Sequence, residues 1–155
     1  MITPNGDVKT LEFNCRMGDP ETQPIMMRLK TDLLEVMLAA TAGQLDTMEL
    51  EWDRRPALGV VVAAAGYPMN PRKGDAITGL PKDSDDAMVF HAGTVEKDGV
   101  ILSAGGRVLC VTALADSVKQ AQQRAYDVAR GIHFDGMQYR RDIGYRAIKA
   151  MGRNE

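Results

Sequence analysis

The feature that most constrains the fold of this chain is a change of hydrophobic pattern around residue 54. Before that point, apolar residues recur at the spacing of one helix face, at Ile25, Leu29, Leu33, Val36, Met37 and Ala40. From Leu45 to Pro56 the chain is polar and without clear period, which is typical of a connector. After it, short apolar runs alternate with turn-forming residues. The pattern predicts an α+β protein in two parts, residues 1–53 and a small β-rich domain with a packed helix at 54–155.

The first residues predict a hairpin with one short arm. Asn5-Gly6 is a strong signal for a two-residue turn, because both turn positions need positive φ, and a strand from Val8 to Asn14 should follow it. Only Met1 to Pro4 precede the turn. Either the hairpin belongs to a larger sheet or the end is simply ragged, and both interpretations stay open. Because strand side chains alternate between faces, Leu11 and Phe13 are expected to face the core.

A helix is predicted to follow this strand. Asp19 suits the N-cap and Pro20 an early helical position. Gly43 suits the end of the helix, because glycine readily takes the left-handed conformation there. Thr31-Asp32 offers a second N-cap, at which the helix can break.

The second part predicts strands, one hairpin and one long helix. The expected strands are Leu58–Ala65, Ala87–His91, Gly93–Glu96, Val100–Ser103 and Arg107–Leu114. Lys97-Asp98-Gly99 is a hairpin turn between the third and fourth of these. Ser117 with Gln120 forms a capping-box pattern that should open a helix ending at Gly131. The tail from Gly136 to Ala150 is expected to end in a short helix.

Composition narrows the classes of function. The net charge of the 155 residues is −2, with both signs interspersed, so a nucleic-acid partner is not expected. The longest apolar run, Val60–Ala65, is far short of the roughly 18 residues of a membrane helix. The first residues lack the charged-then-apolar pattern of a secretory leader, so secretion is not expected. Cys15 and Cys110 lack metal-site spacing. We therefore expect two reduced, partly buried thiols in a cytoplasmic protein.

Glu12 and Asn14 are the sharpest chemical signal. Two positions apart on one strand, they share a face, and Arg16 follows close by. A carboxylate and an amide oxygen suit a magnesium ion that keeps substrate phosphates in its shell. Arg16 suits a phosphoryl group or a carboxylate. The alternative is a pair of exposed polar residues beside a surface ion pair.

Two further segments are candidates for anion binding. The helix start from Asp19 to Gln23 presents backbone N–H groups, although Asp19 and Glu21 can satisfy that end themselves. Ala104-Gly105-Gly106-Arg107 combines glycines that permit close backbone approach with a phosphate-binding guanidinium. A flexible turn before an exposed arginine explains that segment equally simply. His91 suits a structural role at a strand end.

Several strings of this sequence, taken together, resemble the phosphoribosylamine–glycine ligase (glycinamide ribonucleotide synthetase) family. They occur in the order of that family and cover nearly the whole chain. They are LEFNCRMGDPETQP at 11–24, LGVVVAAAGYP at 58–68, VFHAGT at 89–94, GGRVLCVTAL at 105–114, AQQRAY at 121–126, IHFDG at 132–136 and YRRDIGYRA at 139–147. The resemblance implies that residues 1–53 are the C-terminal end of an ATP-grasp domain and residues 54–155 the C-terminal domain of the ligase.

The resemblance also implies the chemistry. ATP would phosphorylate the carboxylate of glycine, and 5-phosphoribosylamine would attack the acyl phosphate, in purine biosynthesis. Glu12 and Asn14 would hold magnesium or manganese, and Arg16 would contact the glycine carboxylate or the acyl phosphate. Asp19 and Glu21 would line the substrate side. Gly105, Gly106 and Arg107 would help to enclose the phosphoribosyl substrate.

The family's ATP-binding elements are absent from this sequence, so the missing N-terminal part of the same enzyme is the expected partner. Two other hypotheses remain. The chain is a non-catalytic fragment or binding module that needs the ATP-binding half from a partner, or it comes from a different ATP-grasp ligase. The Glu-x-Asn pair is common to that wider group, whereas the strings after Leu58 are not.

Overall fold

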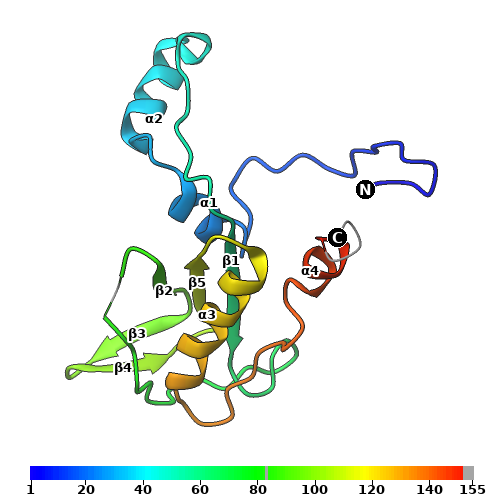
Figure 1. Ribbon diagram of the computed structural model, residues 1–155. Helices are drawn as coiled ribbons and strands as arrows, with labels where there is room; N and C mark the ends of the chain where they lie inside the picture. Colours follow the sequence, from blue (N-terminus) through cyan, green and yellow to red (C-terminus); the bar gives the residue numbers. More distant parts are fainter. Residues whose placement is uncertain (83, 152–155) are drawn as a thin grey trace.

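A computed structural model describes residues 1–82 and 84–151 of the chain, and the described part is α+β, as predicted (Figure 1). Its elements follow in the order α1 (Thr22–Arg28), α2 (Leu33–Ala42), η1 (Leu45–Thr47), β1 (Ala57–Ala63), β2 (Ala87–His91), β3 (Thr94–Lys97), β4 (Val100–Ser103), β5 (Arg107–Leu114), α3 (Val118–Gly131) and α4 (Tyr145–Met151). The bounds of β2, β4 and β5 are those that the sequence predicts. The short terminal helix is also confirmed, as α4.

The centre of the molecule is an antiparallel sheet of strand order β1-β5-β2. The middle strand, β5, pairs on both sides: Val111 lies opposite Val60 in β1 and opposite Val89 in β2. Residues 108–114 are all buried, as expected for a strand covered on both faces. Beside this sheet, β3 and β4 form the predicted hairpin. Its turn residues Asp98 and Gly99 both have positive φ, at 52° and 76°.

Helices cover the two faces of the β1-β5 pair (Figure 1). On one face, α3 buries Ala121, Ala125 and Ala129 against the sheet. The hydroxyl of Ser117 accepts a hydrogen bond from the backbone N–H of Gln120 (3.2 Å), which confirms the predicted cap. On the other face, α1 packs on β1 and β5. This arrangement places the turn before α1 next to the start of β5.

The prediction of a strand from Val8 to Asn14 is wrong, because the structure has no strand there. The turn at Gly6 (φ 87°) is present, and a single bridge joins Ile2 to Val8, but no strand follows. Leu11 and Phe13, expected in the core, are 75% and 94% exposed. A strand needs backbone groups of a neighbouring strand to pair with, and the described residues place none there. The N-terminal segment instead extends away from the sheet (Figure 1).

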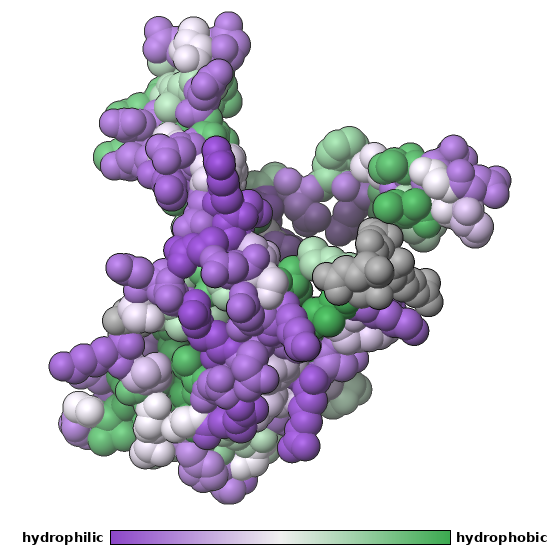
Figure 2. Space-filling view, in the orientation of Figure 1, coloured by the Kyte–Doolittle hydropathy of each residue, from purple (hydrophilic) through white to green (hydrophobic). Residues whose placement is uncertain are grey.

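The predicted first helix is present as two helices with a break between them. The side chain of Asp32 accepts a hydrogen bond from the N–H of Leu34 (2.8 Å), so the second N-cap is confirmed. Gly43 ends α2 in the left-handed conformation (φ 68°), also as predicted. Neither helix fully buries a residue, so the apolar face that the spacing indicates stays partly exposed. The helix α2 projects from the body, with apolar side chains exposed along it (Figure 2).

No described helix has the length and apolar character needed to cross a bilayer. Both cysteines are free thiols. Cys110 is buried in β5, whereas Cys15 is exposed on the N-terminal segment. Burial raises the pKa of the Cys110 thiol, so this group stays protonated and packs as a small apolar side chain.

Candidate functional site

Arg107 and Asp19 form an ion pair between the first residue of β5 and the turn before α1. Nε of Arg107 lies 3.1 Å from Oδ2 of Asp19, and a terminal nitrogen donates to the Asp19 carbonyl at 3.4 Å. Asp19 is therefore not the N-cap that the sequence predicts. That position is Glu21, whose side chain makes no capping bond. The docking of α1 on β5 thus brings two predicted site residues together.

Beside this ion pair lies a pocket of about 440 Å³ on the α1 side of β1. Its floor is the outward face of β1, and its rim carries arginine, tyrosine and amide side chains. The lining residues are Pro20, Gly59, Val61, Ala63, Tyr67, Arg107, Gln138, Tyr139, Arg140 and Ile143. An apolar floor below a few polar and cationic groups is the usual form of a small-molecule site.

The irregular segment 138–143 forms one wall of this pocket. Its first residue, Gln138, pairs with Ala63 through both backbone bonds (2.8 and 2.9 Å). The side-chain amide of Gln138 donates to the carbonyls of Ala64 (3.0 Å) and Tyr67 (3.1 Å). The wall is therefore tied to the end of β1 and to the turn that follows it.

Arg140, on the same wall, makes a two-pronged ion pair with Asp142. Nε bonds Oδ1 at 2.9 Å and a terminal nitrogen bonds Oδ2 at 2.7 Å. This hydrogen bonding raises the pKa of Arg140 and lowers the pKa of Asp142. Arginine carries five N–H donors, and the bonds of Arg107 and of Arg140 each occupy Nε and one terminal nitrogen. Both guanidinium groups therefore keep donors for an anion in the pocket.

Gly105 and Gly106 are next to Arg107 but face protein rather than the pocket. A Cβ on Gly105 would lie 3.0 Å from the Cα of Gly93, so two backbones pack together there. A Cβ on Gly106 would lie 2.6 Å from the ring of Tyr67, which lines the pocket. The space that these glycines leave is thus filled by Gly93 and Tyr67. Their contribution to the pocket is indirect.

Glu12 and Asn14 lie together on the N-terminal segment, away from the pocket lining. The amide of Asn14 donates to Oε1 of Glu12 at 3.2 Å, and both side chains are exposed. Their oxygens suit a hard cation such as Mg²⁺, which accepts other ligands from phosphates and water. Within residues 1–82 and 84–151, no group of three His, Cys, Asp or Glu side chains is placed to hold a metal. The structure thus places these two residues side by side, with both side chains open to solvent.

Two other predicted site residues, Arg16 and Glu21, contact only residues close to them in the sequence. A terminal nitrogen of Arg16 donates to the carbonyl of Met17 at 3.0 Å. The carboxylate of Glu21 lies over Gly18, where a Cβ would approach Oε2 to 2.4 Å. The turn that carries Asp19 is closed instead by the backbone N–H of Thr22, which donates to the carbonyl of Gly18 at 3.1 Å. Nδ1 of His91 shares a hydrogen bond with the hydroxyl of Thr94 at 3.0 Å. This contact is as expected of a structural residue.

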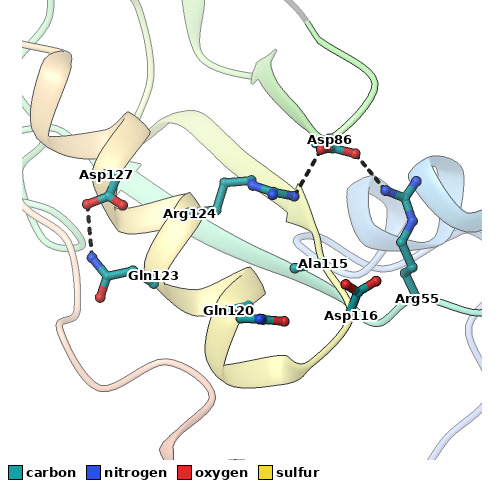
Figure 3. A pocket seen from close by; sticks show the side chains of 8 residues that line it. All are labelled: Arg55, Asp86, Ala115, Asp116, Gln120, Gln123, Arg124 and Asp127. Carbon is teal, nitrogen blue, oxygen red and sulfur yellow. Dashed lines mark hydrogen bonds and ion pairs between the residues drawn. The ribbon is translucent and has the colours of Figure 1, made fainter.

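A second hollow lies at the N-terminal end of α3, between Arg55, Asp86 and Arg124 (Figure 3). Asp86 bonds Arg55 at 2.6 Å and Arg124 at 3.3 Å, so one carboxylate bridges two guanidinium groups. Arg55 also pairs with Asp53 at 2.8 Å, which lowers the pKa of Asp53 to about 2. Sequence reasoning did not identify this network. Because its charges are mutually satisfied, it suits joining of elements better than binding of an anion.

Sequence reasoning also missed the lining residues of the first pocket other than Arg107, among them four with polar side chains: Tyr67, Gln138, Tyr139 and Arg140. A signal was available for the last two. They begin the string YRRDIGYRA, which is rich in arginine and tyrosine and lies outside any predicted core element. Binding residues are disproportionately found on loops that a rigid scaffold positions.

Comparison with known proteins places this chain among related sequences. Residues 57–146 match the family described as phosphoribosylglycinamide synthetase, C domain. The phosphoribosylamine–glycine ligases of Ralstonia nicotianae and Haemophilus influenzae are 64% and 57% identical to it, over 96% of this chain and 35% of each relative. The crystal structure of that ligase from Thermotoga maritima matches with a TM-score of 0.74 at 39% identity, over 92% of this chain and 35% of that one. The chain thus spans only about a third of the length of these relatives.

Proposed function

The chain belongs to the phosphoribosylamine–glycine ligase family, and we propose that it supplies the phosphoribosyl-binding pocket and the metal-binding pair of such a ligase. The complete enzyme would join glycine to 5-phosphoribosylamine with ATP, giving glycinamide ribonucleotide, ADP and phosphate, in the purine biosynthesis of the cytoplasm. The observation that carries this proposal is the pocket at Arg107 and Arg140. Both arginines lie within residues 57–146, which match the family, and the pocket combines their guanidinium groups with an apolar floor.

The pocket suits a sugar phosphate. A phosphate dianion is matched by the free donors of Arg107 and Arg140, because guanidinium groups bind phosphate oxygens through paired hydrogen bonds. The floor formed by Gly59, Val61 and Ala63 suits the carbon face of a ribose. Since the pKa of Arg140 is raised, its charge persists at every physiological pH. These residues would bind and orient the substrate so that its amine is free to react.

Glu12 and Asn14 would hold magnesium, or manganese, through one carboxylate and one amide oxygen. Such an ion, when bound with ATP, offsets the charge of the phosphoryl group in transfer. Arg16 would contact the glycine carboxylate or the acyl phosphate that forms from it. The amine nitrogen then attacks the activated carbonyl carbon, phosphate leaves, and the nitrogen loses a proton. Asp19 and Glu21 shape the turn on the substrate side, where Asp19 also orients Arg107.

The ATP site would lie in the part of the ligase that this chain does not include. The chain matches only 35% of the relatives' length, and its described residues hold no glycine-rich loop before a helix for a nucleotide. The exposed apolar residues Leu11 and Phe13 support the same idea, because a strand there would pair with that missing part.

The chain matches only about a third of the length of its relatives, and this also favours a second candidate function. In it the chain is a non-catalytic module that needs the ATP-binding half from a partner. Calorimetry on the 155 residues tests this second candidate. The module hypothesis predicts no binding of magnesium–ATP by the isolated chain and full binding once the ATP-binding half is added. Tight binding by the chain alone would argue against an inert module.

The proposed function is tested with a hybrid ligase in which this chain replaces the corresponding C-terminal 35% of the Ralstonia nicotianae enzyme. We expect the hybrid to form glycinamide ribonucleotide, with release of ADP that depends on both glycine and phosphoribosylamine. The parent enzyme is the positive control. A folded hybrid that releases no ADP, beside an active parent, would contradict the proposal.

A further inference from the structure

The pocket wall at residues 140–143 is held from behind by a residue that does not line the pocket. The hydroxyl of Tyr126, on α3, donates to the carbonyl of Arg140 at 2.8 Å. The same hydroxyl accepts from the backbone N–H of Ile143 at 3.1 Å. One oxygen atom therefore closes residues 140–143 into a turn and ties that turn to a helix of the core.

Neighbouring contacts make Tyr126 the centre of this support. Its ring lies against the ring of Tyr139, with centroids 6.0 Å apart. One turn earlier on α3, the amide of Gln122 donates to the carbonyl of Ile143 at 2.6 Å. Within the supported turn, Asp142 holds the guanidinium of Arg140 through two bonds. The backbone of Arg140 is thus fixed by Tyr126 and its side chain by Asp142.

We propose that Tyr126 is a positioning residue, whose hydroxyl sets the position of Arg140 at the rim of the pocket opposite Arg107. This inference rests on the proposed function, because Arg140 must meet a phosphate for its position to matter in binding. Without the hydroxyl, residues 140–143 lose the bond that fixes both ends of the turn. The guanidinium then samples several positions, and each is less favourable for an anion shared with Arg107.

The test compares Tyr126→Phe with Tyr145→Phe in the 155-residue chain. The first variant keeps the ring and removes only the hydroxyl. The second removes an exposed hydroxyl on α4 whose bond in this structure is to its neighbour Arg146 (3.1 Å). Circular dichroism checks that both variants fold.

The first measurement needs no ligand. Hydrogen exchange at the backbone N–H of Ile143, followed by NMR, should be about tenfold faster in Tyr126→Phe, because this N–H loses its bond to the hydroxyl, and unchanged in Tyr145→Phe. Equal exchange in wild type and Tyr126→Phe would overturn the positioning role, whatever the ligand.

The second measurement is the Kd of ribose 5-phosphate. Tyr126→Phe should weaken binding by about fivefold to tenfold, the effect of one hydrogen bond, whereas Tyr145→Phe should bind as wild type does. Equal affinity in Tyr126→Phe and wild type would overturn the inference. Absence of binding by wild type would instead contradict the proposed pocket, and the exchange measurement would still decide the role of Tyr126.

Discussion

The carboxylate of Asp19 lies 3.1 Å from the guanidinium of Arg107, although 88 positions separate the two residues in the chain. One belongs to the turn before α1 and the other begins β5. Their contact joins two sequence segments that each suggested anion binding on weak grounds. It also orients Arg107 at the edge of the pocket, with donors left over for a ligand.

Arg107→Ala in the hybrid ligase should lower kcat/KM for phosphoribosylamine by about tenfold to a hundredfold, because a hydrogen bond to a charged group is worth about 1.5–3 kcal/mol. The free energy of unfolding should change by less than about 1 kcal/mol, since the ion pair with Asp19 is exposed to solvent. Steady-state kinetics and urea unfolding check the two statements. The control is Arg141→Ala, an exposed arginine of the wall segment whose side chain does not line the pocket. Equal kinetics for the two variants would contradict a binding role for Arg107.

Gly106→Ala should destabilise the fold by about 1–3 kcal/mol, the usual effect of overpacking. The added methyl would lie 2.6 Å from the ring of Tyr67, so the ring must move and the pocket changes shape. Gly131→Ala is the matched control, because no atom lies within 4 Å of its Cβ. Thermal unfolding should therefore separate the two variants. Equal melting temperatures would show that Tyr67 does not pack on Gly106 in solution.

Glu12→Gln in the hybrid ligase should sharply lower turnover and raise the magnesium concentration needed for half-maximal rate. Folding should survive, because Glu12 is exposed and its bond is to the neighbouring Asn14. Glu35→Gln, on the exposed face of α2, serves as the control. Near-normal turnover of the Glu12 variant at ordinary magnesium would remove the metal assignment.

Asp86→Ala should destabilise the chain by about 1 kcal/mol, a value typical of exposed ion pairs joined in a network. The carboxylate holds Arg55 and Arg124, which come from the connector and from α3 (Figure 3). Its loss removes the ion pairs that join these two elements, while Arg55 keeps its pair with Asp53. Asp85→Ala, at the exposed neighbouring position, should have little effect. Urea unfolding at neutral pH compares them, and equal stability would mean that the network is not formed in solution.

Asp53 makes the stability of the chain depend on pH in the acid range. Folding lowers the pKa of this carboxyl from 3.8 to about 2, chiefly through hydrogen bonds from Arg55. The folded state therefore binds fewer protons than the unfolded state between these values. The stabilising contribution is complete above about pH 4 and is lost as the pH falls toward 2.

Asp53→Asn should accordingly be less stable than wild type at neutral pH, and this difference should shrink as the pH falls from about 4 to 2. Urea unfolding over this pH range measures the difference directly. If the difference in unfolding free energy between wild type and Asp53→Asn stays constant over this pH range, the lowered pKa of Asp53 is contradicted.

The second part of the fold was predictable because its signals are local. Asp98-Gly99 specifies its turn through backbone conformation alone, and Ser117 caps α3 through a bond three residues away. The first part was predicted less well. Leu11 and Phe13 carry a strand pattern, but a strand forms only beside other strands, and the described chain provides none for them.

The residues of the candidate site also divide into those that a local sequence pattern reveals and those that only long-range contacts place. Arg107 was identified because it follows two glycines at the start of a clear strand, and Asp19 because it precedes a helix. Their pairing depends on the docking of α1 on β5, which no local pattern reveals. Tyr139 and Arg140 were missed as site residues because their segment is irregular. Long-range bonds to Ala63 and Tyr126 place them at the pocket.

The central claim is that the pocket between β1 and residues 138–143 binds the phosphoribosyl group, and an NMR titration of the 155-residue chain with ribose 5-phosphate tests it most directly. We predict that the largest shift changes occur at Arg107, Tyr139 and Arg140, with a common saturation curve. Changes centred instead on Asp116 and Gln120 in the second hollow, or no saturable change at all, would contradict the claim.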